Sequence, residues 1–173
     1  MQMFVLDVSP SVSAKCLADV HIRVIGREIT MCLSSWYAKN MGHEDELPYK
    51  QFNHPVVEQF DYAATRNWAV LNADCIFMEY SWRFNKLHAS QEKFQQLLRY
   101  RAKYGVNQFP VGPTAFSLAL FNFVEKGAGV TRDLPIHEAV RRYRDYYRRK
   151  LAAMKVPVTY TKSTKPEWLE ESK

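Results

Sequence analysis

The segment from Ser13 to Trp36 constrains the fold most, because its apolar residues recur with the period of an α-helix. At steps of three and four residues these form one apolar seam, made of Ala18, Ile22, Ile25, Ile29, Cys32 and Trp36. A helix with this pattern buries the seam against other helices. The sequence therefore predicts one long core helix from Ser13 to Trp36.

Two polar side chains lie beside this seam. His21 and Glu28 are seven residues apart, so the predicted helix nearly stacks them on the side that also carries Leu17 and Met31. An imidazole and a carboxylate that lose contact with water need partners and shift their pKa values, as catalytic groups often do. The alternative is that both are satisfied buried groups that connect helices.

The composition favours one intracellular domain. A chain of 173 residues is long enough for one ordinary core. No apolar run approaches the roughly 18 residues of a membrane span, and no signal-peptide pattern begins the chain. The three cysteines lie in predicted apolar helices without CxxC spacing, which argues against a disulfide framework and a zinc knuckle. We expect a cytoplasmic protein that does not contact a membrane.

A second helical region runs from Val56 to Phe84, after Asn53 and Pro55, which are typical of a helix start. Its later part predicts a second buried seam, made of Trp68, Leu71, Cys75, Met78 and Trp82. Glu79 lies on the same side and Arg83 at its margin. At four-residue spacing they are either an ion pair that stabilises the helix or part of a site.

Three further helices are predicted, at 90–104, 114–124 and about 133–154, so we expect an all-α, single-domain bundle of about five helices. We expect a helical domain at 1–155, followed by a C-terminal strap or tail at 156–173.

The last predicted helix separates aromatic from basic residues. Its basic face carries Arg141, Arg142, Arg144, Arg148 and Arg149. Residues 141–155 have a net charge of +6, which equals the formal charge of the whole chain. Arginines on one helix face suit the phosphates of DNA. The alternative is an ordinary solvated helix face.

Several enzyme classes lack their motifs here. The chain has no GxxxxGK[ST] loop, GxGxxG fingerprint, HExxH pair or GxSxG elbow. No spacing demands a metal ion, and we expect neither a metal nor a cofactor. Inward carboxylates and histidines near a basic surface are the groups expected for acid–base chemistry on a bound polyanion.

Two motifs resemble the first helix of the phage pyrimidine-dimer DNA glycosylases of the endonuclease V type. They are the string Leu17 to His21 and the pair Arg27-Glu28. The segment from His54 to Phe84 resembles the second helical stretch of that family. The resemblance implies the glycosylase scaffold, with Glu28 as the catalytic carboxylate and Arg27 as a DNA contact. The nucleophile of that family is an N-terminal threonine amine, whereas this chain begins Met1-Gln2.

A second resemblance covers nearly the full length. Its motifs are Phe4 to Pro10, the set Asp19, His21 and Glu28, Asn53 to Pro55, Glu79 to His88, Tyr143 to Tyr147, and Pro166 with Trp168. They are similar to a family of small phage proteins associated with thymine hypermodification. In that chemistry an amino acid or amine is attached at an activated 5-hydroxymethyluracil.

This resemblance implies a monomeric enzyme of the infected host cell that flips a modified base out of double-stranded DNA. A free amino acid or amine would be its co-substrate. The implied catalytic residues are Glu28, His21 and Asp19. The implied substrate and phosphate contacts are Asn53, His54, Glu79, Arg83, Lys86 and His88. The implied DNA contacts are Arg23, Arg27, Arg141, Arg144, Arg148 and Arg149. A pyrimidine-dimer glycosylase and a non-catalytic DNA-binding or host-interaction protein are the alternatives.

Overall fold

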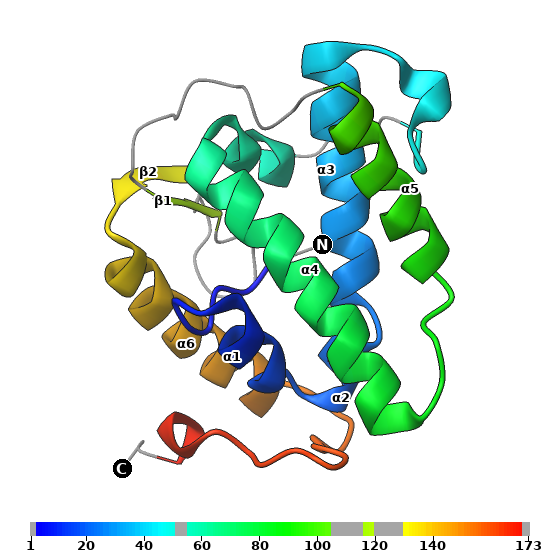
Figure 1. The fold of residues 1–173 in the computed structure, drawn as a ribbon. Helices are drawn as coiled ribbons and strands as arrows, with labels where there is room; N and C mark the ends of the chain where they lie inside the picture. Colours follow the sequence, from blue (N-terminus) through cyan, green and yellow to red (C-terminus); the bar gives the residue numbers. More distant parts are fainter. Residues whose placement is uncertain (1–2, 51–54, 105–115, 120–129, 171–173) are drawn as a thin grey trace.

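The computed structural model describes residues 3–50, 55–104, 116–119 and 130–170, and it is predominantly helical (Figure 1). The α-helices are α1 (Pro10–Lys15), α2 (Asp19–Ile22), α3 (Ile25–Met41), α4 (Ala63–Phe84), α5 (Gln91–Lys103) and α6 (Ile136–Ala152). The 3-10 helices are η1 (Glu44–Glu46), η2 (Pro55–Asp61) and η4 (Glu167–Leu169). The predicted class, a helical bundle, is confirmed. Its similarity to the glycosylase scaffold stays a prediction.

Helices α3 and α4 lie side by side at the centre of the bundle (Figure 1). Their contact depends on Gly26, because a Cβ atom there would lie 3.1 Å from Ile76 Cγ2 and from two ring atoms of Phe77. Helix α5 packs on α3, and α1 packs on α4. Helix α6 runs on the other side of α1 (Figure 1). Among the described helices, none combines the length and the apolar character needed to cross a membrane.

The prediction of one continuous helix from Ser13 to Trp36 is wrong. The chain forms α1, α2 and the first part of α3 instead, with Ala18 extended at ψ 157°. The break before α2 follows from tertiary hydrogen bonds: the Ala18 amide donates to the Tyr147 hydroxyl at 2.8 Å and the Asp19 amide to the Thr159 carbonyl at 2.9 Å. The predicted seam is nevertheless buried in full, from Ala18 to Trp36.

The predicted seam of α4 is also wrong in part. Trp68 is buried, but Leu71, Met78 and Trp82 are 58%, 57% and 54% exposed. The buried face of α4 carries polar residues beside small and large apolar ones, such as Ala69 and Phe77. For example, the Asn72 side chain donates to the Pro10 carbonyl at 2.9 Å. A polar group with a partner can be buried in this way, while apolar residues on the other face of the helix meet water.

The helix predicted at 114–124 is contradicted where the structure describes it. Strand β1 (Phe116–Ala119) pairs antiparallel with β2 (Val130–Leu134), with Leu118 opposite Thr131 and Ala119 opposite Val130. The remainder of the predicted helix lies outside the described residues. An apolar run this short fits a strand as well as a helix, and here a pairing partner farther along the chain decides between them.

The C-terminal strap, described at residues 156–170, returns from the end of α6 past α2 and α1 (Figure 1). Its contacts begin at Thr159 and Thr161, which bind Asp19. They end at η4, which packs on α6. The strap therefore connects α2 to α6.

Candidate functional site

Three of the predicted site residues meet in one buried network, which we call the Arg83 network. The side chain of Arg83 is fully buried at the end of α4. Its Nε donates to Glu79 Oε1 at 2.7 Å, and its Nη1 donates to Asp19 Oδ1 at 3.1 Å. Nη1 and Nη2 also donate to the carbonyls of Leu17 (2.8 Å) and Lys15 (3.0 Å). Arg83 could therefore bind a leaving phosphate only if this network opened.

Asp19 holds the strap to the network. Its carboxylate accepts hydrogen bonds from Thr159 Oγ1 at 2.9 Å, from Thr161 Oγ1 at 2.7 Å and from the Thr161 amide at 3.0 Å. Burial alone would raise the pKa of Asp19, but these bonds and the one from Arg83 outweigh burial and lower the pKa. Asp19 is thus an ionised positioning residue whose oxygens are already used by the protein.

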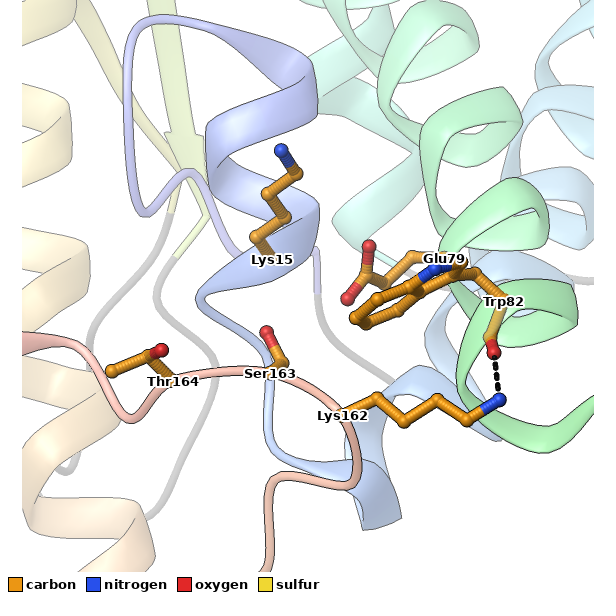
Figure 2. A pocket seen from close by; sticks show the side chains of 6 residues that line it. All are labelled: Lys15, Glu79, Trp82, Lys162, Ser163 and Thr164. Atoms are coloured by element: carbon orange, nitrogen blue, oxygen red, sulfur yellow. Dashed lines mark hydrogen bonds between the residues drawn. The ribbon is translucent and has the colours of Figure 1, made fainter.

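A cavity of about 520 Å³ lies beside this network (Figure 2). It is lined by Lys15, Glu79, Trp82, Lys162, Ser163 and Thr164. Glu79 belongs to both features, since it pairs with Arg83 and also lines the cavity. Glu79, a predicted substrate contact, therefore lies in a cavity formed by α1, α4 and the strap, and its role stays a prediction.

His21 lies in a second group of residues, which we call the Lys150 cluster: Phe4, His21, Glu28, Tyr147 and Lys150. His21 is buried, and its Nδ1 lies 2.8 Å from the Tyr147 hydroxyl. The same hydroxyl accepts the Ala18 amide, so Tyr147 connects His21 to the start of α2. Burial, together with the positive charge of Lys150, lowers the pKa of His21 from 6.5 to about 4.

Glu28 and Lys150 form the accessible side of this cluster. Lys150 is partly buried on α6, with Nζ 5.2 Å from the centre of the Phe4 ring. Burial lowers the pKa of Lys150, while the charge of Glu28 acts to raise it. Glu28 itself is partly exposed. Of the three predicted catalytic residues, Glu28 is the one that a substrate reaches most easily.

Lys150 and Tyr147 are site residues that the sequence analysis missed. The signal was their spacing: Tyr143, Tyr147 and Lys150 follow one another at four and three residues, so Lys150 lies on the aromatic face of α6. It is thus separate from the arginines with which its charge was counted. Which residues Lys150 meets depends on how α6 packs, and spacing does not reveal this.

The arginines of α6 are engaged to different degrees. Arg144 donates to the Leu6 carbonyl at 2.8 Å and pairs with Asp7 at 3.1 Å. Arg148 pairs with Asp145 at 3.0 Å and donates to the Trp168 carbonyl at 2.6 Å. These two arginines therefore hold the N-terminal segment and η4.

The other three arginines lie nearer to water. Arg141 and Arg142 pair with Glu138, but the Arg141 side chain is still 64% exposed. Arg149 is exposed. Of the five arginines, Arg141 and Arg149 are consequently the more accessible to a phosphate backbone.

The remaining predicted site residues lie apart from both groups. His88 accepts the Ser90 amide at Nδ1 (3.0 Å), so its Nε2 donates to the Arg23 carbonyl (2.9 Å). The guanidinium of Arg23 lies 4.6 Å from the Phe84 ring centre. Arg27 and Lys86 are exposed. Asn53 and His54 lie outside the described residues.

Comparisons of the chain with protein-family models, with curated proteins and with solved structures found no match. The two motif resemblances thus stay predictions. Within the described ranges, no group of three or more His, Cys, Asp or Glu side chains is arranged to hold a metal ion.

Because His21 is neutral when folded, acid should weaken the fold. The unfolded chain binds a proton at this residue near pH 6.5, but folded His21 does so only at about pH 4. Stability should therefore fall by about 3 kcal/mol between these pH values and then level off for this group. Urea unfolding at several pH values measures the loss. His21→Asn, whose side-chain amide can hydrogen-bond Tyr147 in place of the imidazole, should remove most of this loss of stability.

The matched control is His137→Gln at an exposed position of α6. It should keep the pH dependence of the unmodified protein. Asp19 affects the stability of the fold in a different pH range. Because its carboxylate pKa is lowered in the folded chain, its protonation costs stability only as the pH falls below about 4. An unchanged slope in the His21 variant would contradict the assignment of a neutral imidazole.

Proposed function

We propose that this chain is a DNA-modifying enzyme that flips a modified thymine or 5-hydroxymethyluracil base. It transfers an amino acid or amine to the activated 5-methylene group of that base. The motifs along nearly the whole chain support this proposal. The observation that carries it is the position of Glu28, a partly exposed carboxylate grouped with a neutral imidazole and a partly buried amine.

In the proposed reaction, the nitrogen of the incoming amine forms a bond to the 5-methylene carbon. The bond from that carbon to the phosphorylated oxygen breaks, and the leaving group departs with its electron pair. Glu28 takes the proton that the amine loses, which is a general-base role. His21 acts as a positioning residue, because its Nδ1 is occupied by Tyr147.

DNA would be held by the accessible arginines of α6. Arg141 and Arg149 can meet phosphates, and each phosphate contact releases counterions, so binding should weaken with salt. A flipped base also needs an aromatic surface. Trp36 and Trp68 are buried, so neither offers its ring to a base in this structure. The proposed setting is the cytoplasm of the infected cell, without a cofactor.

Glu28→Gln should reduce product formation about 100-fold or more while leaving the melting temperature unchanged. The substrate is DNA with pyrophosphorylated 5-hydroxymethyluracil, incubated with mixed amino acids. Mass spectrometry of the digested nucleosides detects an amino-acid-bearing base. Glu92→Gln, at an exposed position of α5, is the matched control and should keep full activity. Full activity of Glu28→Gln, or an equal loss of stability, would contradict the catalytic role.

A second candidate function, a pyrimidine-dimer glycosylase and lyase, is favoured by one specific observation. Lys150 is an amine whose pKa is lowered by burial, and it lies in the cluster that contains Glu28. A more readily deprotonated amine can attack C1′ of a deoxyribose, release the base and form an imine. Lys150 would then replace the N-terminal amine that the resembling family uses.

Borohydride reduction tests this second function, because it converts an imine between protein and DNA into a stable covalent adduct. With UV-irradiated DNA, the unmodified protein should form the adduct and Lys150→Met should not. Lys155→Met, at an exposed lysine just beyond α6, should still form it. Absence of an adduct with the unmodified protein, or an adduct that persists in Lys150→Met, would contradict Lys150 as the nucleophile.

A further inference from the structure

The cavity beside the Arg83 network has the size of a small-molecule site. Its volume of about 520 Å³ lies within the usual range for such sites. Figure 2 shows its walls: Lys15 from α1, Glu79 and Trp82 from α4, and Ser163 on the strap. Three segments far apart in the sequence thus contribute side chains of different chemical character to one cavity.

One wall of the cavity carries excess negative charge. Asp19 and Glu79 share the single guanidinium of Arg83, so the three buried charges sum to one negative charge. Asp19 receives further hydrogen bonds from the strap. The Glu79 side chain is 9% exposed, and its carboxylate points into the cavity (Figure 2). A buried carboxylate in this position favours a cationic group on a ligand.

The facing side of the cavity suits an anionic group. Lys15 is exposed and lies across the cavity from Trp82, and Ser163 and Thr164 bring hydroxyl groups from the strap (Figure 2). Lys162 is fixed differently, since its Nζ donates to the Trp82 carbonyl at 2.9 Å and to Asn85 Oδ1 at 2.7 Å. In Figure 2 the Lys15 ammonium points away from these hydroxyls, but its side chain is exposed and long enough to turn toward a ligand. Lys15 and the two hydroxyls are therefore the groups on this side that suit a carboxylate.

Trp82 provides the apolar wall. Its indole is 54% exposed although it lines the cavity. A large aromatic side chain that stays in contact with water can bury that area against the apolar part of a ligand. The cavity thus combines a carboxylate, a cation with hydroxyls, and an aromatic surface.

We propose that this cavity binds a free α-amino acid. The ligand ammonium pairs with Glu79, its carboxylate lies against Lys15 and the hydroxyls of Ser163 and Thr164, and its side chain packs on Trp82. That this amino acid is the donor for transfer to DNA rests on the proposed function, in which its amine leaves Glu79 for Glu28 before it bonds to the base. The binding itself follows from the charges and surfaces of the cavity.

Binding of the twenty standard L-amino acids to the full chain tests this inference by ligand-observed NMR and then by calorimetry. For the tightest ligand, the decarboxylated amine and the deaminated acid are the matched probes. Each analogue should bind about ten-fold more weakly or worse, because it leaves one charged group of the cavity unpaired. Equal binding of either analogue, or no binding of any amino acid at millimolar concentration, would overturn the proposal.

Variants at exposed positions locate the binding. Lys15→Ala and Trp82→Ala should each raise the Kd about ten-fold, and neither removes a side chain from the Arg83 network. Lys39→Ala on α3 and Leu71→Ala on α4 are exposed controls that should leave the Kd unchanged. Unchanged binding in both cavity variants would show that the site lies elsewhere.

The same variants separate this inference from the proposed function. If the protein transfers an amino acid to DNA and Lys15→Ala leaves the KM for that amino acid unchanged, the cavity assignment fails and the transferase stands. If amino-acid binding responds to the cavity variants but no modified nucleoside forms, the cavity assignment stands and the transferase fails.

Discussion

The burial of Arg83 is the constraint on which much of this structure depends. A guanidinium stays charged in a protein, so a buried one needs acceptors on all sides. Two carboxylates and two backbone carbonyls supply them. The carbonyls of Lys15 and Leu17 lie where the helical segment is broken. That break also frees Asp19 to bind Thr159 and Thr161 of the strap. One interaction thus connects α1, α2, α4 and the C-terminal segment.

The sequence predicted the helical class and the core seam of residues 18–36, because burial follows the helical period directly. It also suggested that Glu79 and Arg83 form an ion pair, because they are four residues apart on one helix. The break before α2 depends on Tyr147 and Thr159, more than a hundred residues away. Local pattern does not contain such partners. The outer face of α4 was misassigned because apolar side chains occur on both of its faces.

In the candidate site, too, some positions could be predicted from the sequence pattern, whereas others depend on how the helices pack. The sequence placed His21 and Glu28 near one another, and a helix break separates them. In the structure Lys150 lowers the pKa of His21, and Glu28 acts to raise the pKa of Lys150. Lys150 itself was counted with the arginines of α6, because only the packing of that helix brings it to Phe4. Asp19, predicted as catalytic, and Arg83, predicted as a phosphate contact, pair with each other in the network beside the Glu79 cavity. Their predicted roles stay predictions.

The role of Arg83 is tested most directly by the free energy of urea unfolding of Arg83→Met, alone and combined with Asp19→Asn. The single change should cost about 3–5 kcal/mol, because it leaves buried carboxylates without their cation. Adding Asp19→Asn should then recover part of that loss, since it removes one uncompensated charge. A cost below about 1 kcal/mol for Arg83→Met, or a purely additive further loss in the double variant, would contradict this account.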